Sequence, residues 1–366
     1  MSTVDILKKQ FLDYITNKQK DRTEISQQSG GLTLATFNVH YWTDVNENNK
    51  SKEIIEDIKK IKADIIILQE AALGDFTIDK QKILGNYVVN NLSMNGYKKQ
   101  ILCNTVPSWW NIPYGNLALI HDSFINTLNC DGICSILNET NYTFKKSDTT
   151  VTVSGKHQGT LETRCYVKIV IPISLGKTEN IVVYGTHLDV ASEKTRDIQI
   201  TQIINDAEKY HAKSSIIIMG DFNTIDDEQY KNTEILRNLE SIGQKTFKVI
   251  KTLKKKGFND AFTVAGITPP DMTTWNNSRV DFIFVKNIER SDIAEIKPIY
   301  TINSDHLPIF IRLNNTTAKV IGNISLCKTK MKIVYNGKSY TIYEGKRGGK
   351  YIKINNTFIS IKKLGV

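Results

Sequence analysis

Six apolar segments of this 366-residue chain each border a carboxylate, an amide or an imidazole. Apolar segments of this length are typical of buried strands. Polar groups at their ends should meet at one edge of a sheet, where α/β proteins usually carry out their chemistry. Acidic, amide and imidazole groups suit a hard cation and a phosphate better than a redox cofactor. The polar residues at these ends are Asn38, Glu70, His187 followed by Asp189, Asp221 followed by Asn223, Asp281, and Ser304-Asp305-His306.

Two of these ends offer oxygen ligands for a metal ion. Asn38 and Glu70 each close a predicted buried strand and can lie side by side. Mg²⁺ prefers oxygen ligands, needs only one or two carboxylates and keeps several waters. A single Glu at the end of a strand is usually just a solvated residue without a function. That interpretation is weaker here, because six strand ends in one chain carry such polar groups.

Asp221 and Asn223 are two residues apart, so both point to one side of an extended segment. The carboxylate can orient or deprotonate a water molecule, and the amide can hold that water or a phosphate oxygen. Gly220 allows the backbone to approach a ligand closely. The alternative is a simple Asp-x-Asn turn, which is common after strands.

Two histidines belong to this pattern, and we expect the other histidines to be structural. One of His187 and His306 can donate to phosphoryl oxygens and offset charge in the transition state. The other can act in acid–base catalysis if a carboxylate fixes its tautomer, and Asp281 is the candidate partner of His306. The histidines outside the pattern are His40, His121, His157 and His211.

Three further residues are candidate phosphate contacts. Arg164, at the start of a predicted strand, can hold a phosphate; the alternative is a surface salt bridge with Glu162. Tyr114 and Asn116 come just before an apolar Leu-Ala-Leu-Ile segment and can reach the same edge of the sheet.

The charge balance favours a polyanionic partner. The chain carries 48 Lys and Arg against 38 Asp and Glu, a formal net charge of +10. Nucleic acid or an anionic membrane surface would suit this charge. The alternative is that lysine merely fills solvated faces, because net charge says nothing about the fold.

The sequence also predicts an intracellular protein. Its first residues lack a basic segment followed by an apolar core, so we expect no signal peptide. We expect no stable membrane insertion, because no segment reaches transmembrane length without charge. The five cysteines are scattered, which favours reduced thiols over a disulfide framework. The expected location is the cytoplasm or nucleus, or a viral particle or its host cell if the chain is viral.

The order of the predicted elements indicates three regions. Residues 1–31 form an amphipathic helix, over 4–18, and a polar linker. In 32–313 strands alternate with helices at 51–62 and 192–212, in strand–helix–strand order. The segments 116–121, 149–153 and 164–173 follow one another without clear helices, which indicates hairpins. A mixed sheet, or two stacked sheets flanked by helices, therefore fits better than a purely parallel sheet.

Residues 314–366 read as a small basic β module. Lysines alternate with β-branched and aromatic residues, and Asn336-Gly337 is a typical hairpin turn. A second turn lies at Lys346-Arg347-Gly348-Gly349-Lys350, and the module resembles short basic modules in proteins of large DNA viruses. It can contact nucleic acid or be a solvated β cap.

Taken together, the motifs resemble those of the exonuclease–endonuclease–phosphatase superfamily. This superfamily includes deoxyribonucleases, abasic-site endonucleases, tyrosyl-DNA phosphodiesterases, sphingomyelinases and inositol polyphosphate 5-phosphatases. Each motif is weak alone, but six in family order across residues 36–310 are a specific pattern. The motifs are Phe37-Asn38-Val39, Leu68-Gln69-Glu70, Gly185-Thr186-His187-Leu188, Gly220-Asp221-Phe222-Asn223, Arg279-Val280-Asp281-Phe282-Ile283 and Ser304-Asp305-His306.

The resemblance implies an α+β fold with four layers, in which two packed mixed sheets lie between outer helices. It implies Mg²⁺ or Mn²⁺ on Asn38 and Glu70, with Asp305 near the metal. The reaction it implies is in-line attack on a phosphoester by a water molecule that Asp221 and Asn223 orient.

The same resemblance implies roles for the two histidines. His187 would stabilise the pentacovalent state, and His306, paired with Asp281, would act as general base or position the phosphate. The superfamily tolerates more than one assignment of the base, so Asp221 and His306 remain alternative bases.

Departures from family patterns narrow the choice of subfamily. Abasic-site endonucleases carry an acidic residue where this chain has His40, and inositol 5-phosphatases have Cys-Asp-Arg where it has Val280-Asp281-Phe282.

We therefore expect a metal-dependent phosphodiesterase acting on nucleic acid, in first place a DNA endonuclease or a DNA-end or repair enzyme. The alternatives are a sphingomyelinase or phosphoinositide phosphatase, and a nucleic-acid-binding module on an inactive scaffold. The last is disfavoured, because each of the six motifs keeps its polar residue.

Overall fold

The computed structural model describes most of the chain. The described residues are 2–20, 31–78, 80–104, 112–127, 138–143, 164–171, 173–190, 192–230, 236, 247–314, 316–318, 326–335, 338–345, 350–354 and 357–360.

The first of two large sheets is mixed and has six strands. β1 is parallel to β2 and antiparallel to β15, and the remaining pairs are antiparallel. In order across the sheet, the strands are β14 (Ile293–Pro298), β15 (Ile309–Leu313), β1 (Leu32–Asn38), β2 (Ile65–Ala72), β6 (Tyr114–Ile120) and β5 (Lys99–Asn104).

The second large sheet also has six strands and the same mixed character. β10 is parallel to β11, and the other pairs are antiparallel. In order across the sheet, the strands are β12 (Asn259–Asp260), β13 (Asp281–Lys286), β11 (Ser214–Asp221), β10 (Asn180–His187), β8 (Cys165–Ile171) and β7 (Asn138–Thr143).

Each parallel pair is joined by a helix that covers the outer face of its sheet. α2 (Ser51–Ile61) connects β1 to β2, and α5 (Glu193–Ala207) connects β10 to β11. The side chain of Ser192 accepts a hydrogen bond from the Thr195 amide and so caps α5. Both helices confirm the elements predicted at 51–62 and 192–212.

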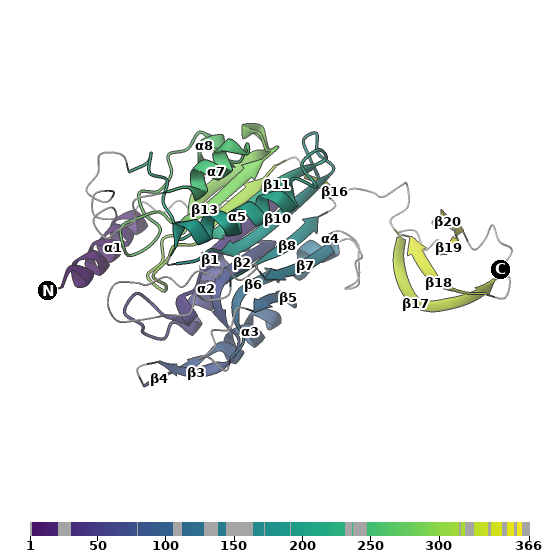
Figure 1. Ribbon diagram of the computed structural model, residues 1–366. Helices are drawn as coiled ribbons and strands as arrows, with labels where there is room; N and C mark the ends of the chain where they lie inside the picture. Colours follow the sequence, from purple (N-terminus) through teal and green to yellow (C-terminus); the bar gives the residue numbers. More distant parts are fainter. Residues whose placement is uncertain are drawn as a thin grey trace.

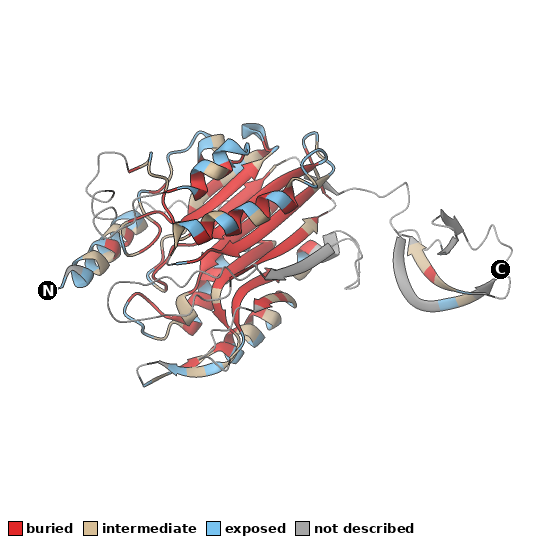
Figure 2. Ribbon diagram, viewed as in Figure 1, coloured by how far each residue is buried: buried red, intermediate tan, exposed pale blue. Residues whose placement is uncertain are grey.

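The inner strands contain continuous apolar runs because both of their faces are buried. In β2, Ile65 and Ile67 belong to the core between the sheets, whereas Ile66 and Leu68 pack in the cluster that includes α2 and α3 (Gly85–Met94). In the second sheet the outer face packs against α5 and α7 (Val249–Lys255). The order helix, sheet, sheet, helix is visible in Figure 1, and the buried strands lie at its centre in Figure 2. The predicted four-layer α+β fold is confirmed.

The stretch from 116 to 173 differs in part from the prediction, which had no clear helix there. The segments at 116–121 and 164–173 belong to different sheets, β6 to the first and β8 to the second. A short helix, α4 (Asp122–Thr127), follows β6 directly. The segment predicted at 149–153 lies outside the described residues.

Small elements complete the two-sheet unit. They are the 3₁₀ turns η1 (His40–Trp42) and η2 (Arg290–Asp292), the helix α8 (Ala261–Ala265), the hairpin of β3 (Asp75–Ile78) with β4 (Gln81–Leu84), and the pair of β9 (Ile173–Leu175) with β16 (Thr316–Ala318).

The C-terminal residues form a separate antiparallel sheet, drawn in yellow in Figure 1. The turns predicted at 336–337 and 346–349 lie outside the described residues, but antiparallel strands flank both positions. The strands are β17 (Leu326–Tyr335), β18 (Lys338–Gly345), β19 (Lys350–Ile354) and β20 (Thr357–Ser360). The division of the chain into domains stays a prediction.

The N-terminal helix α1 (Thr3–Lys20) is present as predicted and packs against the two-sheet unit. Phe11 and Ile15 are buried with Leu307, and Gln19 Nε2 donates to the Tyr300 carbonyl at 2.9 Å. Its apolar side thus lies beside the segment that carries His306. None of the helices in the described ranges has the length and apolar character to cross a membrane.

Gly220 permits close packing of β10 against β11. Its φ is +148°, and a Cβ atom at this position would lie 1.8 Å from the Thr186 carbonyl oxygen. Backbone atoms of a paired strand cannot move aside without breaking the ladder. Only glycine therefore fits immediately before Asp221.

We expect Gly220→Ala to destabilise the protein, because strain of this kind costs about 1–3 kcal/mol even before the clash is counted. Gly257→Ala is the matched control, since Gly257 also has a positive φ, of +79°, but only the flexible Lys286 Cε atom lies near it, at 3.7 Å. Urea unfolding measures both variants. Equal losses of stability would show that the close approach at Gly220 is unimportant.

Candidate active site

Four of the polar residues named from the sequence meet because their strands are neighbours in register. His187 is paired with Asp221 in the parallel ladder of β10 and β11, and Asp221 is paired with Asp281 at the start of β13. In the other sheet, Asn38 ends β1 opposite Gln69 of β2. The ends of these strands therefore lie at one edge of both sheets.

Glu70 reaches this edge through a β-bulge. The pairing of β2 with β6 shifts between Leu68 and Ala71, and Glu70 itself has a left-handed φ of +55°. Bulges of this kind redirect a side chain and are common near functional sites. A left-handed conformation of a non-glycine residue is strained, and such strain is also concentrated at functional sites.

The Asn38 side chain joins the two sheets at this edge. It is fully buried, and its Nδ2 donates to Glu70 Oε1 and to Asp221 Oδ2, each at 3.0 Å. Its Oδ1 accepts from the His40 amide at 3.0 Å. One amide group therefore fixes the distance between the Glu70 carboxylate of the first sheet and the Asp221 carboxylate of the second sheet.

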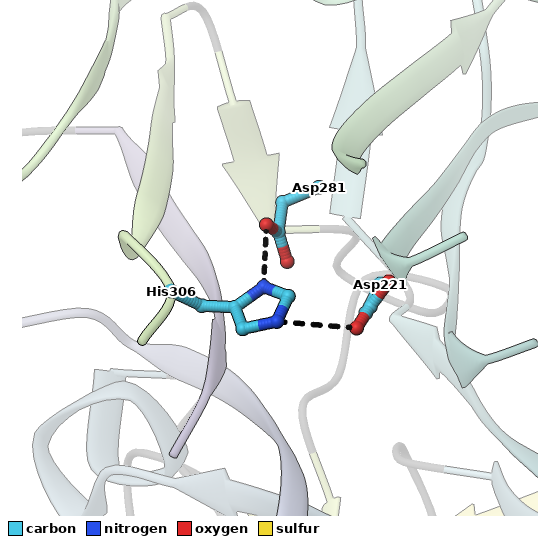
Figure 3. Close-up of side chains that lie close together, drawn as sticks. All are labelled: Asp221, Asp281 and His306. Carbon is cyan, nitrogen blue, oxygen red and sulfur yellow. Dashed lines mark hydrogen bonds and ion pairs between the residues drawn. The ribbon is translucent and has the colours of Figure 1, made fainter. Parts of the chain in front are cut away.

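The His306 imidazole lies between the carboxylates of Asp281 and Asp221 (Figure 3). His306 Nδ1 lies 2.9 Å from Asp281 Oδ2, and His306 Nε2 lies 3.7 Å from Asp221 Oδ2. All three residues are buried. The hydroxyl of Thr273 accepts hydrogen bonds from the Val280 and Asp281 amides and so fixes the start of β13.

The segment that carries His306 is tied to the first sheet. Ser304 is fully buried, and its hydroxyl donates to the Asn38 carbonyl at 2.8 Å. Asp305 Oδ1 lies 3.7 Å from His40 Nδ1 and 4.0 Å from His306 Nε2. Asp305 therefore lies between two imidazoles, close to the residue that ends β1.

His187 faces an arginine on one side and the acidic residues on the other. Arg164 Nη1 lies 3.0 Å from His187 Nδ1. A guanidinium can only donate, so Nδ1 is the acceptor and the neutral ring carries its proton on Nε2. That nitrogen lies 3.4 Å from Asp221 Oδ2 and 3.9 Å from Glu70 Oε1.

Asn223 stabilises the turn after β11. Its φ is +49°, its amide N–H donates to Asp221 Oδ1 at 2.8 Å, and its Nδ2 donates to the Leu188 carbonyl at 3.0 Å. Nδ2 also lies 2.8 Å from His187 Nε2; with the imidazole proton on Nε2 this is a close approach of two donors and not a hydrogen bond, and it shows that the side chain borders both the imidazole and the carboxylate. The Asp-x-Asn turn considered from the sequence is present, and it brings these groups together.

The surroundings of the two histidines shift their pKa values in opposite directions. Burial, followed by the positive charges of Arg164 and His306, holds the pKa of His187 well below its ordinary value. Burial alone would also lower the pKa of His306, but the carboxylates of Asp281, Asp305 and Asp221 outweigh it and raise that pKa well above its ordinary value. At neutral pH the site therefore holds one neutral and one protonated imidazole.

Asp221 has a raised pKa. Burial has the largest effect, the charge of Asp281 adds to it, and the positive charge of His306 opposes it; together they raise the pKa of Asp221 to about 7. A carboxylate with such a pKa exchanges protons readily at neutral pH.

Two groups of residues fit a metal ion. Asp221, Asp281 and His306 offer ligand atoms within 4.8 Å of one another, but His306 Nδ1 is already hydrogen-bonded to Asp281. Glu70 Oε2, beside Asn38, is buried and has no hydrogen-bond partner among the described residues, and the same is true of Asp281 Oδ1. A buried carboxylate oxygen without a partner is costly, and a hard cation would satisfy it.

The three predicted phosphate contacts have different surroundings. Arg164 is buried against His187, and not on the surface. Asn116 Nδ2 donates to the Cys165 carbonyl at 2.8 Å and so links β6 to β8. Tyr114 is buried, with its ring stacked on that of Tyr41 at 5.3 Å. Phosphate binding by these residues stays a prediction.

Two residues that shape the site were given no role from the sequence. Thr273 anchors Asp281, and Ser304 anchors the His306 segment to Asn38. Ser304 is visible in the sequence as part of the Ser-Asp-His motif, whereas no local pattern marks Thr273, because its partners come later in the chain.

A family profile and several solved structures are similar to this chain. The sequence profile of the endonuclease/exonuclease/phosphatase family matches residues 35–306. A family protein from Beutenbergia cavernae has a similar structure, with a TM-score of 0.55 and 13% identity, covering 90% of this chain and 81% of that chain. One from Leptotrichia buccalis has a TM-score of 0.50 and 20% identity, covering 77% and 99%. A humanized TDP2 from D. rerio has a TM-score of 0.48 and 14% identity, covering 78% and 100%. No curated protein sequence matches the chain.

The raised pKa of Asp221 predicts a pH-dependent effect of Asp221→Asn on stability. An acid with a higher pKa in the folded state loses its contribution to stability as the pH rises from its ordinary value of 3.8 through about 7. The free energy of unfolding of the wild type, relative to Asp221→Asn, should therefore decrease over this range. At about 1.4 kcal/mol per pKa unit, the upper limit is about 4 kcal/mol.

Urea unfolding of both proteins in EDTA, from pH 4 to 8, measures this difference. Asp206→Asn is the control, because its ion pair with Lys168 and Lys209 lowers the pKa of Asp206. A difference for Asp221→Asn that stays constant with pH would contradict the assigned shift.

Proposed function

Because the chain belongs to the endonuclease/exonuclease/phosphatase family, whose members are generally hydrolases of phosphodiester bonds, we propose that it is a divalent-metal-dependent phosphodiesterase acting on nucleic acid. The observation that carries this proposal is the meeting of Asn38, Glu70, Asp221, Asp281 and His306 at one edge of the sheets.

The metal ligands in this proposal are Asn38, Glu70 and Asp305, with Mg²⁺ or Mn²⁺ as the ion. The buried, unpartnered Oε2 of Glu70 supports this choice. Asp281 Oδ1 is likewise unpartnered, but His306 Nδ1 is already hydrogen-bonded to the same carboxylate, which disfavours an ion among Asp221, Asp281 and His306. A bound cation would polarise a phosphoryl oxygen and offset negative charge. The amide of Asn38 holds Glu70 Oε1 in place, which leaves Oε2 for the ion.

Asp221 is the base that these contacts favour. Its pKa of about 7 leaves a large fraction ionised at neutral pH, and the amide of Asn38 orients its Oδ2. A water molecule held by Asp221 and Asn223 would attack the phosphorus in line. His306 is the alternative base, but Asp281 and the neighbouring carboxylates favour its protonated form, which suits binding of a phosphate oxygen better.

His187 would donate from Nε2 to a phosphoryl oxygen as charge accumulates there. Burial and then the charge of Arg164 lower the pKa of His187 and keep the imidazole uncharged, and the guanidinium at Nδ1 leaves the proton on Nε2, so the ring is a neutral donor. Donors that are already in position cost no reorganisation when the reaction occurs.

Nucleic acid, and DNA in first place, is the proposed substrate class. The net charge of +10 and the basic C-terminal sequence support a polyanionic substrate. Sphingomyelin and inositol phosphates are the alternatives within the same chemistry.

We expect Glu70→Gln and His306→Ala each to lower turnover at least about 100-fold, because the first weakens binding of the cation and the second removes a positive charge that stabilises the transition state. The assay compares Mg²⁺ with EDTA on plasmid DNA, abasic DNA, 5′-tyrosyl DNA, RNA, sphingomyelin and inositol phosphates.

His211→Ala is the matched control for His306→Ala, because His211 is an exposed histidine that contacts the Glu208 carbonyl. Full turnover of Glu70→Gln or His306→Ala would refute the site assignment. Cleavage of sphingomyelin or inositol phosphates, and of no nucleic acid, would refute the substrate class.

Removal of residues 319–366 tests the C-terminal module and leaves β16 in place. We expect weaker DNA binding and a shallower salt dependence, by about 0.9 in the logarithmic slope for each phosphate that the shortened chain no longer neutralises. Fluorescence anisotropy at several salt concentrations measures the slope, and turnover of bis-p-nitrophenyl phosphate checks that the site is intact. An unchanged slope would mean that the module does not contact DNA.

A further inference from the structure

The segment between β14 and β15 carries Asp305 and His306 but is neither strand nor helix. Its second half is tied to the site by Ser304, and the Leu307 amide donates to the Thr273 carbonyl at 2.8 Å. Its first half, at residues 301–303, needs another anchor if the imidazole is to keep its place.

Asp57 of α2 provides that anchor. Its Oδ2 accepts from the Thr301 hydroxyl at 2.6 Å and from Asn303 Nδ2 at 2.7 Å. The Asn303 amide N–H in turn donates to the Thr301 hydroxyl at 3.1 Å. One carboxylate oxygen therefore holds both ends of the Thr301–Asn303 turn.

The carboxylate of Asp57 is buried on the inner side of its helix. The residue is 7% exposed and Thr301 is 4% exposed. A basic group, Lys60 Nζ, lies 3.9 Å from the other carboxylate oxygen, on a side chain that is 71% exposed. Hydrogen bonds to a carboxylate are stronger than those between neutral groups. The bonds from Thr301 and Asn303 to Asp57 are also much shorter than the contact with the exposed Lys60, so Asp57 chiefly stabilises the 301–303 segment.

We propose that Asp57 is a positioning residue for the active site. It holds Thr301 and Asn303 so that Asp305 and His306 reach Asp221 and Asp281 in the observed geometry. The inference rests on the proposed role of His306, but it concerns a residue of α2 that contacts none of the site residues directly in the hydrogen bonds described.

The test compares Asp57→Ala with Asp57→Asn. The asparagine can place its carbonyl oxygen where Oδ2 lies and keep both hydrogen bonds, whereas alanine loses both. Because a displacement of about 1 Å can lower a rate about 100-fold, we expect kcat on bis-p-nitrophenyl phosphate to fall about 10- to 100-fold in Asp57→Ala. Asp57→Asn should stay within about threefold of the wild type, and KM should change little in either variant.

Asp197→Ala is the matched control. Asp197 of α5 accepts a hydrogen bond from the Thr252 hydroxyl at 2.7 Å and joins α5 to α7, so its loss removes a similar bond without touching the 299–308 segment. We expect this variant to lose stability and to keep kcat.

A second readout does not depend on activity. The Nδ1 proton of His306, hydrogen-bonded to Asp281, should give a downfield proton resonance in the metal-free protein that is absent from His306→Ala. We expect the resonance to be lost or shifted in Asp57→Ala and retained in Asp57→Asn and Asp197→Ala.

The outcomes separate this inference from the proposed function. A folded Asp57→Ala protein with wild-type kcat and an unchanged His306 resonance would overturn the positioning role, as would an Asp57→Asn protein as impaired as Asp57→Ala. If His306→Ala retained full turnover, the proposed function would fail first, whereas the resonance would still report whether Asp57 holds His306.

Discussion

The hydrogen bonds of the Asn38 amide connect the two sheets where the site is formed, and the remaining geometry depends on them. One buried nitrogen donates to Glu70 in the first sheet and to Asp221 in the second. Loss of such a donor leaves two buried acceptors unsatisfied. Three local features place the groups around this amide: the bulge at Glu70, the glycine before Asp221 and the turn at Asn223. They bring the acceptors to the amide and direct the opposite atoms of the same side chains into the site.

The ionisable groups around the Asn38 amide differ in charge from one side of the site to the other. Burial and the charge of Arg164 lower the pKa of His187 on one side, while Asp281 and its neighbouring carboxylates raise the pKa of His306 on the other. Asp221 lies within 3.7 Å of both imidazoles and has a pKa near neutrality. A neutral donor, a cation and a titrating carboxylate therefore surround one position, which is the combination that phosphoester hydrolysis by an activated water requires.

Much of this arrangement could be predicted from local sequence. Strands such as β2 and β11 contain apolar runs because both of their faces are buried, and α2 shows helical spacing, so their ends and the polar residues there could be located. Contacts between distant residues could not. The contact of Arg164 with His187 joins the residue before β8 to the last residue of β10 and has no local signal in the sequence. The anchor formed by Asp57 and Thr301 joins residues 244 positions apart, and no periodicity reveals such a pair. For the same reason strand propensity did not show that β6 and β8 join different sheets.

The most direct test of the account is to locate a bound ion. Crystals grown with Mn²⁺ and measured at a wavelength where manganese scatters anomalously would show its position. The account predicts an anomalous peak within coordination distance of Glu70 Oε2, beside Asn38 and Asp305. A peak between Asp221, Asp281 and His306, with no density at Glu70, would contradict it.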